Sequence, residues 1–378
     1  MSIPAQNQQY ENFIIRYKQN IEGVPEYQPD ERFQIINDLF GVLYVPIQEI
    51  PELALNSYSY SSIPRCYTYM DTGALSASGV TRLHGHPYLK LKGSGTLVAI
   101  IDSGIDYLHP AFHRGMTSKI LSIWDQELES GLTERIPFGR EFNRGEIEQA
   151  LSAENPWEVV PSMDKSGHGT EVAATAAGYS IEKEGFSGAA PEAELVVVKL
   201  KQAKRYLRDL YLLPQEADIY QEDDIMLAIA YVLRVAAENQ KPLSICIGLG
   251  SSMGAHQGEG PLNEYINSIA AFSQNAVSVP AGNEGTARHH YMKTLSAANI
   301  KDTIELRVGE KESTRGFMLE FWGDSPNFYS MMIQSPAGEQ LSVSTSLKNS
   351  TQELYFVFVE TKVLVNYVPI ERRTGNTL

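Results

Sequence analysis

The sequence has few cysteines, no excess of cationic residues and no long hydrophobic run. Cys66 and Cys246 are the only cysteines among 378 residues. Two cysteines so far apart do not make a disulfide framework. We therefore expect two reduced thiols, as in proteins of a reducing compartment.

The balance of charge excludes several classes of partner. The formal net charge is −15, whereas binding to a phosphate backbone or to anionic lipid needs clustered Lys and Arg. No apolar run approaches the ~18 residues of a membrane span. Residues 1–20 lack the basic start and apolar stretch of a secretory signal. We expect no nucleic-acid partner, no membrane partner and no signal peptide.

Residues 1–70 predict a small α+β unit. Branched and aromatic residues favour strands over 13–17, 41–47 and 66–70. Between the first two, 31–40 predicts a helix that ends at a glycine. Three apolar side chains would share one face of that helix: Phe33, Ile36 and Phe40.

Residues 71–300 alternate short apolar runs with helical patterns. Such runs suit parallel strands that are covered on both faces, and they lie at 96–102, 194–200, 243–249 and 275–282. An apolar stripe at helical spacing occupies 225–236. The alternation predicts an α/β fold with a doubly wound parallel sheet, whose functional residues would lie at the carboxyl ends of the strands.

Residues 301–378 change to short segments of strand character separated by turn residues. The spacing predicts the start of a β-rich insert, a sandwich or jelly roll. The segments are 303–308, 317–323, 327–334, 340–346 and 353–360.

Two residues follow patterns that suit acid–base chemistry. Asp102 ends an apolar strand, and a buried carboxylate there can orient an imidazole. Alone, the pattern also suits an Asp that caps a turn. His168 lies in Ser-Gly-His-Gly-Thr at 166–170, where glycines let the backbone pass close to a substrate. Alone, it could equally be a surface histidine.

Three further residues could bind a substrate. Asn283, in Ala-Gly-Asn-Glu-Gly at 281–285, could donate its amide to a developing oxyanion or simply form a turn. Leu249 and Gly250 end an apolar strand whose edge could pair with an extended peptide, or they are a plain strand end.

Two pairs of histidines raise the question of a metal. They are His84 with His86 and His289 with His290. Neither pair has cysteine or carboxylate partners at metal-site spacing, so we expect no metal site.

Three blocks of sequence together resemble the subtilisin family of serine proteases. They read VAIIDSGID at 98–106, SGHGTEVAATAA at 166–177 and VPAGNEG at 279–285. They resemble the Asp, His and oxyanion-Asn blocks, in the order known for subtilisin.

The resemblance implies a role for each matched residue. Asp102 would orient His168, His168 would act as general base, and Asn283 would stabilise the oxyanion. Leu249 and Gly250 would form the substrate-binding strand, with Gly248 where the family usually has Ser.

The resemblance also implies the domains and the partners. Residues 1–70 would be a propeptide, 71–300 an incomplete catalytic domain and 301–378 the start of the insert. The partners would be a protein or peptide substrate and the chain's own propeptide. We expect no cofactor, and the residues leave calcium binding open.

The sequence resembles one branch of this family in particular. Asp102 and His168 are 66 residues apart (168 − 102), and Ile-Trp-Asp-Gln at 123–126 lies between them. With no secretion signal and a β-rich insert, the chain looks like the Csp germination proteases of clostridial spores and related intracellular Firmicutes subtilases. This resemblance implies a cytoplasmic or spore-associated protein.

The family's Gly-Thr-Ser-x-Ala block, which carries the nucleophile, does not occur in the sequence. We expect the serine to lie beyond residue 378 and this chain alone to be inactive. The alternative is a non-catalytic pseudoprotease that binds a partner or signal. An unrelated α/β hydrolase or nucleotide-binding protein is disfavoured, because we identify no serine elbow and no Gly-rich phosphate loop.

Overall fold

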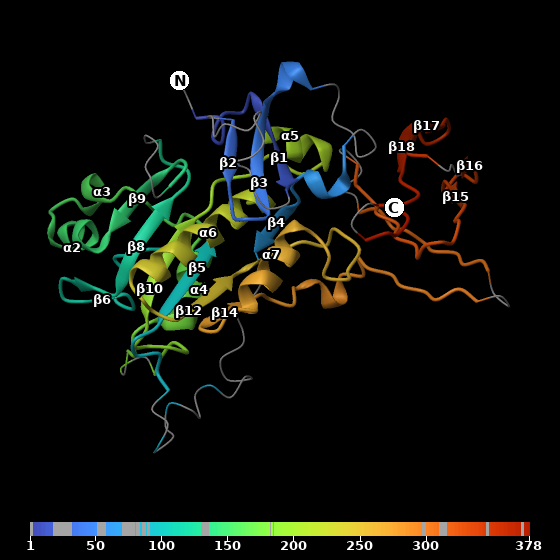
Figure 1. Ribbon diagram of the computed structural model, residues 1–378. Coiled ribbons are helices and arrows are strands. Elements are labelled where there is room, and N and C mark those ends of the chain that lie inside the picture. The colour runs from blue at the N-terminus through green and yellow to red at the C-terminus, as the bar shows by residue number, and fades with distance from the viewer. Residues whose placement is uncertain are drawn as a thin grey trace.

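The computed structural model shows a layered α/β body with a small β-sheet unit and a pair of β-hairpins attached to it (Figure 1). It describes residues 3–17, 32–50, 58–69, 80, 84, 88, 91–129, 136–181, 183, 185–296, 300–309, 316–344, 348–371 and 374–378.

The body is built on a six-stranded sheet with the strand order β14-β12-β5-β10-β8-β9. Neighbouring strands are parallel except for the edge strand β9, which is antiparallel to β8. The predicted α/β class is therefore right, and the sheet is mixed rather than purely parallel. The strands in chain order are β5 (Leu97–Asp102), β8 (Ile120–Asp125), β9 (Arg140–Asn143), β10 (Glu194–Lys199), β12 (Leu243–Ile247) and β14 (Asn275–Ser278).

Helices cover both faces of this sheet because the strand side chains alternate in direction. In β5, Leu97, Ala99 and Ile101 join the core beneath α6 and α7. The intervening Val98 and Ile100 join a second core with α2 and α4. The helices are α2 (Arg144–Ser152), α3 (Pro156–Val159), α4 (His168–Ala177), α5 (Arg205–Leu210), α6 (Glu222–Glu238) and α7 (Pro261–Ala270).

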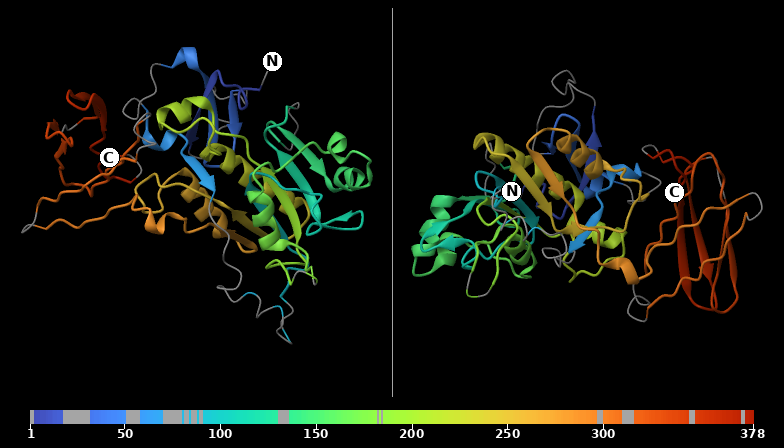
Figure 2. Two further views of the ribbon diagram at one scale, coloured as in Figure 1. Left: turned by 180° about the vertical axis from the view of Figure 1, so that it is seen from behind. Right: turned by 90° about the horizontal axis from the view of Figure 1, so that it is seen from below.

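The N-terminal unit is an antiparallel sheet that packs against the body beside α6 (Figures 1 and 2). Its order is β1-β3-β2. Phe40, Val42 and Tyr44 of the middle strand are buried in the same core as α6. The strands are β1 (Tyr10–Arg16), β2 (Phe33–Ile35) and β3 (Phe40–Pro46).

The helix predicted over 31–40 is wrong, because these residues form β2 and a tight turn. The Asn37 side chain accepts hydrogen bonds from the backbone N–H groups of Leu39 and Phe40, each 2.8 Å long. A short polar side chain that bonds the backbone ahead of it favours a turn over a helix. The apolar residues at helical spacing are nonetheless buried, on either side of this turn: Phe33, Ile36 and Phe40.

A second, smaller sheet lies at the carboxyl edge of the body. Its order is β11-β4-β13, with β4 in the middle. The predicted strand over 66–70 is thus present as β4, antiparallel to both neighbours. The bounds are β4 (Cys66–Tyr69), β11 (Tyr220–Gln221) and β13 (Leu249–Gly250).

The C-terminal region forms two antiparallel hairpins rather than a closed sandwich within the described residues. Residues 303–308 and 317–322 are described but form no strand. They have no ladder of hydrogen bonds with a neighbouring strand in the part of the chain that is described, and a strand requires such a ladder. The hairpin strands are β15 (Met331–Gln334), β16 (Gln340–Val343), β17 (Ser350–Phe356) and β18 (Thr361–Tyr367).

Smaller elements complete the fold. They are η2 (Ile47–Glu49), η3 (Tyr60–Ser62), β6 (His113–Arg114), β7 (Thr117–Ser118) and η5 (Glu284–Thr286). None of the described helices has the length and apolar character needed to cross a membrane.

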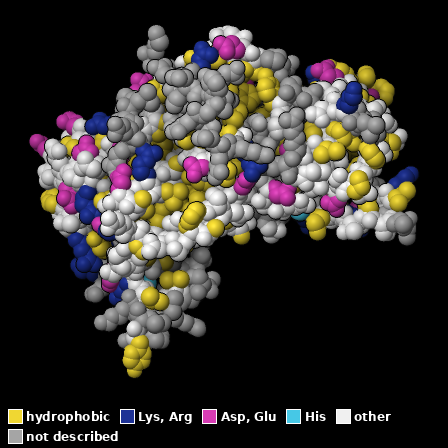
Figure 3. All heavy atoms as spheres, viewed as in Figure 1, with side chains coloured by type: hydrophobic (Ala, Val, Ile, Leu, Met, Phe, Trp, Pro, Cys, Tyr) yellow, Lys and Arg dark blue, Asp and Glu magenta, His cyan; other side chains and the backbone are white. Residues whose placement is uncertain are grey.

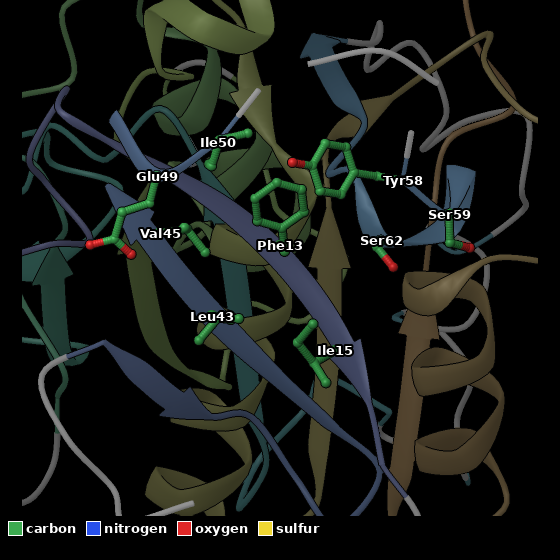
Figure 4. A pocket seen from close by; sticks show the side chains of 9 residues that line it. All are labelled: Phe13, Ile15, Leu43, Val45, Glu49, Ile50, Tyr58, Ser59 and Ser62. Carbon is green, nitrogen blue, oxygen red and sulfur yellow. The ribbon is translucent and has the colours of Figure 1, made fainter. Parts of the chain in front are cut away.

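An apolar hollow of about 250 Å³ lies on the N-terminal unit (Figure 4). Side chains of β1 and β3 form its floor, and the segment around η3 forms one wall. Its lining residues are Phe13, Ile15, Leu43, Val45, Glu49, Ile50, Tyr58, Ser59 and Ser62.

Candidate active site

The structure brings Asp102 and His168 into direct contact. Asp102 is the last residue of β5 and is fully buried, and His168 is the first residue of α4. His168 Nδ1 lies 2.7 Å from Asp102 Oδ1, which also accepts a hydrogen bond from the backbone N–H of Ser103. The carboxylate therefore holds the imidazole with Nδ1 inward, which leaves Nε2 on the opposite edge of the ring.

Glycine lets the start of α4 approach the end of β5 so closely. A Cβ atom at Gly169 would lie 2.3 Å from the carbonyl oxygen of Gly104. Gly167, which caps the helix, has φ of +81°, a conformation that glycine adopts without strain. The small residues that marked this block in the sequence thus allow the contact between the Asp102 carboxylate and the His168 imidazole.

Asp164 holds the turn before His168, a role that the sequence did not reveal. Its two carboxylate oxygens accept hydrogen bonds from the hydroxyls of Ser103 and Thr170, at 2.8 and 2.6 Å, and from the N–H groups of Gly167 and Thr170. Burial opposes ionisation, but these hydrogen bonds outweigh it and lower the pKa of Asp164. A charged Asp164 therefore ties α4 to the turn that follows Asp102.

Gly248 lies directly against the Asp–His pair. A Cβ atom there would lie 2.3 Å from Asp102 Oδ2 and 3.2 Å from His168 Cε1. That Oδ2 atom is buried and has no hydrogen-bond partner among the described residues. The replacement of the family's usual Ser by Gly248 therefore makes room for the carboxylate in its present position.

Leu249 and Gly250 form a strand edge, and that edge is occupied. Leu249 pairs with Tyr69 and Gly250 pairs with Thr68, both in the antiparallel β4. An extended segment of the chain itself therefore lies where the sequence predicted that a peptide would bind. On its other side, β4 pairs with β11.

Asn283 follows β14, the strand next to β12 at one edge of the sheet. The residue is exposed and adopts a helical conformation just before η5. The structure thus places it on the carboxyl side of a neighbouring strand in the same sheet, and the oxyanion role stays a prediction.

A polar hollow of about 420 Å³ lies beside the pair. Ser103 and Ser166, which are close in sequence to Asp102 and His168, line one side, and Tyr220 of β11 lines another. Charged residues of both signs line the rest: Glu127, Lys165, Lys199, Arg208, Glu216 and Asp218. The hollow therefore lies between the start of α4 and β11, the strand that pairs with β4.

The sequence contains a match to the serine-elbow motif of α/β hydrolases, but the structure does not form an elbow there. Residues 250–254 read Gly-Ser-Ser-Met-Gly, a match to G-x-S-x-G that the sequence interpretation overlooked. An elbow needs a sharp turn from a strand directly into a helix. Here the next helix, α7, begins only at Pro261.

No group of three His, Cys, Asp or Glu side chains that could hold a metal occurs among the described residues. His84 lies 2.7 Å from the carbonyl of Ala189, and His289 pairs with Glu284 at 2.6 Å. His86 lies outside the described residues.

Known proteins resemble this chain in sequence and in fold. A family model described as the subtilase family matches residues 93–300. An extracellular protease of Xanthomonas campestris pv. campestris is 32% identical over 111 residues, which are 29% of this chain and 18% of that protein. The CspB protease of Clostridium perfringens has a similar structure, with a TM-score of 0.59 at 23% identity. That match covers 80% of this chain and 59% of the other, so the chain spans less than two thirds of either relative.

Proposed function

Because the chain belongs to the subtilase family, we propose that it carries the Asp and His of a serine endopeptidase whose serine lies outside these 378 residues. The 2.7 Å contact between His168 and Asp102, beside an edge that holds an extended segment, is the observation that carries this proposal. The substrate would be a protein or peptide, and we propose a cytoplasmic or spore-associated location by similarity to Csp proteases.

The chemistry follows from the orientation of the imidazole. His168 Nε2 would take the proton of the serine hydroxyl as its oxygen attacks the peptide carbonyl carbon. Asp102 would stabilise the resulting imidazolium, and the Asn283 amide would donate to the oxyanion. His168 would then give the proton to the leaving amine, and the C–N bond would break to leave an acyl-enzyme. Water, activated by His168 in the same way, would release the acid and restore the serine.

The strand β4 supports the interpretation of residues 1–70 as a propeptide. It occupies the edge of β13 beside the Asp–His pair, a place that we call the cleft. The strand β4 is antiparallel to β13, with Thr68 paired to Gly250 and Tyr69 paired to Leu249, so it runs toward Gly248. Gly248 is the residue against the Asp–His pair. This register favours cleavage after Met70, although Met70 and Asp71 lie outside the described residues. In this proposal 71–300 is the catalytic domain and 301–378 begins an insert.

The experiment compares the 378-residue chain with a longer version that includes a Gly-Thr-Ser-x-Ala block. The longer protein should hydrolyse quenched peptides and yield a new N-terminus at residue 71, detectable by mass spectrometry. His168→Ala should abolish both, because loss of the histidine in subtilisin costs about 10⁶ in turnover. His109→Ala is the matched control and should retain activity, because His109 lies in a turn where its Nδ1 accepts a hydrogen bond from the N–H of Ala111. A longer protein that contains the serine yet cleaves nothing would favour the pseudoprotease alternative.

A further inference from the structure

The segment in the cleft is anchored by an arginine just before β4. Arg65 is only 6% exposed and Glu222, its partner, 1%. Arg65 Nη2 lies 2.7 Å from Glu222 Oε1, and Arg65 Nε lies 3.3 Å from Glu222 Oε2. Such a two-point contact between guanidinium and carboxylate is strong and geometrically selective.

The carboxylate lies directly after β11, the strand that pairs with β4. Glu222 directly follows β11, and its N–H donates to the carbonyl of Arg65, which continues the β11–β4 ladder by one residue. Glu222 Oε2 also accepts the backbone N–H of Arg65 at 3.2 Å. The recognition of Arg65 and the pairing of β4 are therefore parts of one binding surface.

The protein can hold this carboxylate in place even without the arginine. Glu222 is the first residue of α6, and its Oε1 accepts the N–H of Leu262 in the first turn of α7. Helix N-termini stabilise negative charge. Because α6 and α7 both begin here, the Glu222 carboxylate has a hydrogen-bond donor besides Arg65.

Two glycines shape the walls around the guanidinium. A Cβ atom at Gly260 would lie 2.0 Å from Arg65 Nη2, and one at Gly254 would lie 2.8 Å from Arg65 Nη1. Asn263 Oδ1 is 3.5 Å from Nη2. The space therefore fits a planar cation, and any side chain on Gly260 would fill it.

From these contacts we propose that the cleft contains an arginine pocket, formed by Glu222, Gly254, Gly260 and Asn263, that selects substrates. Substrates would carry Arg four residues before the residue that pairs with Leu249, as Arg65 stands to Tyr69. This inference rests on the proposed function for the claim of cleavage, but not for the claim of binding. In the present structure the chain's own Arg65 fills the pocket.

Binding is tested without catalysis, on the 378-residue chain with Arg65→Gln, in which the segment in the cleft lacks the cation. Two labelled peptides of residues 63–70, one with Arg65 and one with Arg65→Gln, are titrated by fluorescence anisotropy. The Arg peptide should bind at least about 30-fold more tightly, since truncating one partner of a buried charge pair costs that much or more. Adding Glu222→Gln to the chain should remove the difference. Equal affinities in the Arg65→Gln chain would overturn the pocket.

Two glycine variants separate the pocket from a general loss of fold. Gly260→Ala should abolish the preference for the Arg peptide, because its methyl group would occupy the guanidinium site. Gly258→Ala is the control, since Gly258 also has positive φ, +73°, but a Cβ there meets nothing within 4 Å. A preference that survives Gly260→Ala would contradict the proposed walls.

Catalysis is tested on the longer protein that contains the serine, with quenched peptides spanning residues 63–74. The ratio of kcat/KM for the Arg peptide over the Arg65→Gln peptide should be at least about 30, and Glu222→Gln should bring that ratio near 1. A ratio near 1 in the wild type would overturn selection of substrates by the pocket. Arg-selective binding with no hydrolysis of either peptide would overturn the proposed function and leave the pocket standing.

Discussion

The N-terminal sheet and the C-terminal hairpins are both antiparallel β-structure attached to the same α/β body, yet they are attached in different ways. The N-terminal unit is joined by buried polar contacts. Lys204, at the start of α5, is 1% exposed. Its Nζ donates to the carbonyls of Pro4 and Tyr10, at 2.8 and 3.1 Å, and to Asn12 Oδ1 at 2.7 Å.

The C-terminal hairpins have few buried polar contacts with the body among the described residues. Phe358 at their tip is 78% exposed and Val357 is 73% exposed. The ion pair between Lys362 and Glu353 is half exposed on both sides. Figure 3 shows apolar side chains on the surface of this lobe, which Figure 2 shows beside the body. Its attachment includes Glu320, Trp322 and the C-terminal Leu378.

The difference teaches that alternating strand patterns do not reveal how firmly a sheet is attached. Both regions show such patterns in the sequence, but a buried ammonium group needs every acceptor that surrounds it. The N-terminal unit should therefore unfold together with the body, whereas the hairpins should be only weakly coupled to it.

The strongest test of this contrast removes the buried ammonium. Lys204→Met should lower the free energy of unfolding by about 3 kcal/mol, because it leaves three buried acceptors without their donor. Urea unfolding followed by tryptophan fluorescence measures this loss. Lys362→Met is the control and should leave the midpoint unchanged, since exposed ion pairs contribute little. Similar shifts for the two variants would remove the contrast.

The next test uses pH. Burial, and then the nearby Lys201 ammonium, lower the pKa of Lys204 from 10.5 to about 7, although Asp223, Asp224 and Glu11 oppose the shift. Between these two values the unfolded chain binds more protons than the folded one, so stability should rise with pH, by at most about 1.4 kcal/mol per unit.

The measurement is best confined to pH 7–8.5. Burial raises the pKa of Cys66 to about 12, so the folded thiol keeps its proton and stability should fall again above pH 9. Lys119, whose pKa burial lowers to about 8, acts in the same direction as Lys204. Subtracting the urea midpoints of Lys204→Met from those of the wild type isolates Lys204. An identical slope in the variant would show that other groups cause the rise.

The smallest effect is expected at the contact of the C-terminal lobe. Glu320 accepts hydrogen bonds from Tyr60 at 2.8 Å, from the N–H of Gly254 at 2.8 Å and from Trp322 at 3.0 Å. Glu320→Gln should cost about 1 kcal/mol in unfolding free energy, because an amide oxygen is a weaker acceptor than a carboxylate. It should also speed hydrogen exchange at Gly254. A loss as large as that of Lys204→Met would mean that the lobe is coupled to the body after all.

Four strands of the central sheet, β5, β10, β12 and β14, lie in the apolar runs that predicted them. The signal is clearest in β5 and β10, which are buried along almost their whole length. β8 and the edge strand β9 were not predicted, and β9 is largely polar. Residues 31–40 could not be predicted, because Asn37 decides between a helix and a turn through hydrogen bonds that a pattern of apolar residues does not show. The strands predicted over 303–308 and 317–322 are absent for a related reason. Their residues favour strands, but they form no hydrogen-bonded ladder with a neighbouring strand among the described residues.

The candidate site could likewise be predicted only in part from the sequence. Asp102 and His168 carry recognisable blocks, and the structure brings them together. Asp164 and Glu222 lie in no such block, and the contact of Gly248 with the pair could not be foreseen from its place in the strand. Their contacts join segments far apart in the chain, and only the folded structure reveals which backbone or charge each one faces.

The pairing of β4 with β13 has a consequence for how fast other peptides can bind. A ligand tethered to its own binding site acts at an effective concentration of about millimolar, whatever the concentration of the protein. Free peptides therefore compete with β4 as they would with a millimolar inhibitor that dilution cannot remove. The delay before a newly folded molecule can accept a foreign peptide should then depend on how fast β4 leaves, and should be the same in dilute and concentrated solutions.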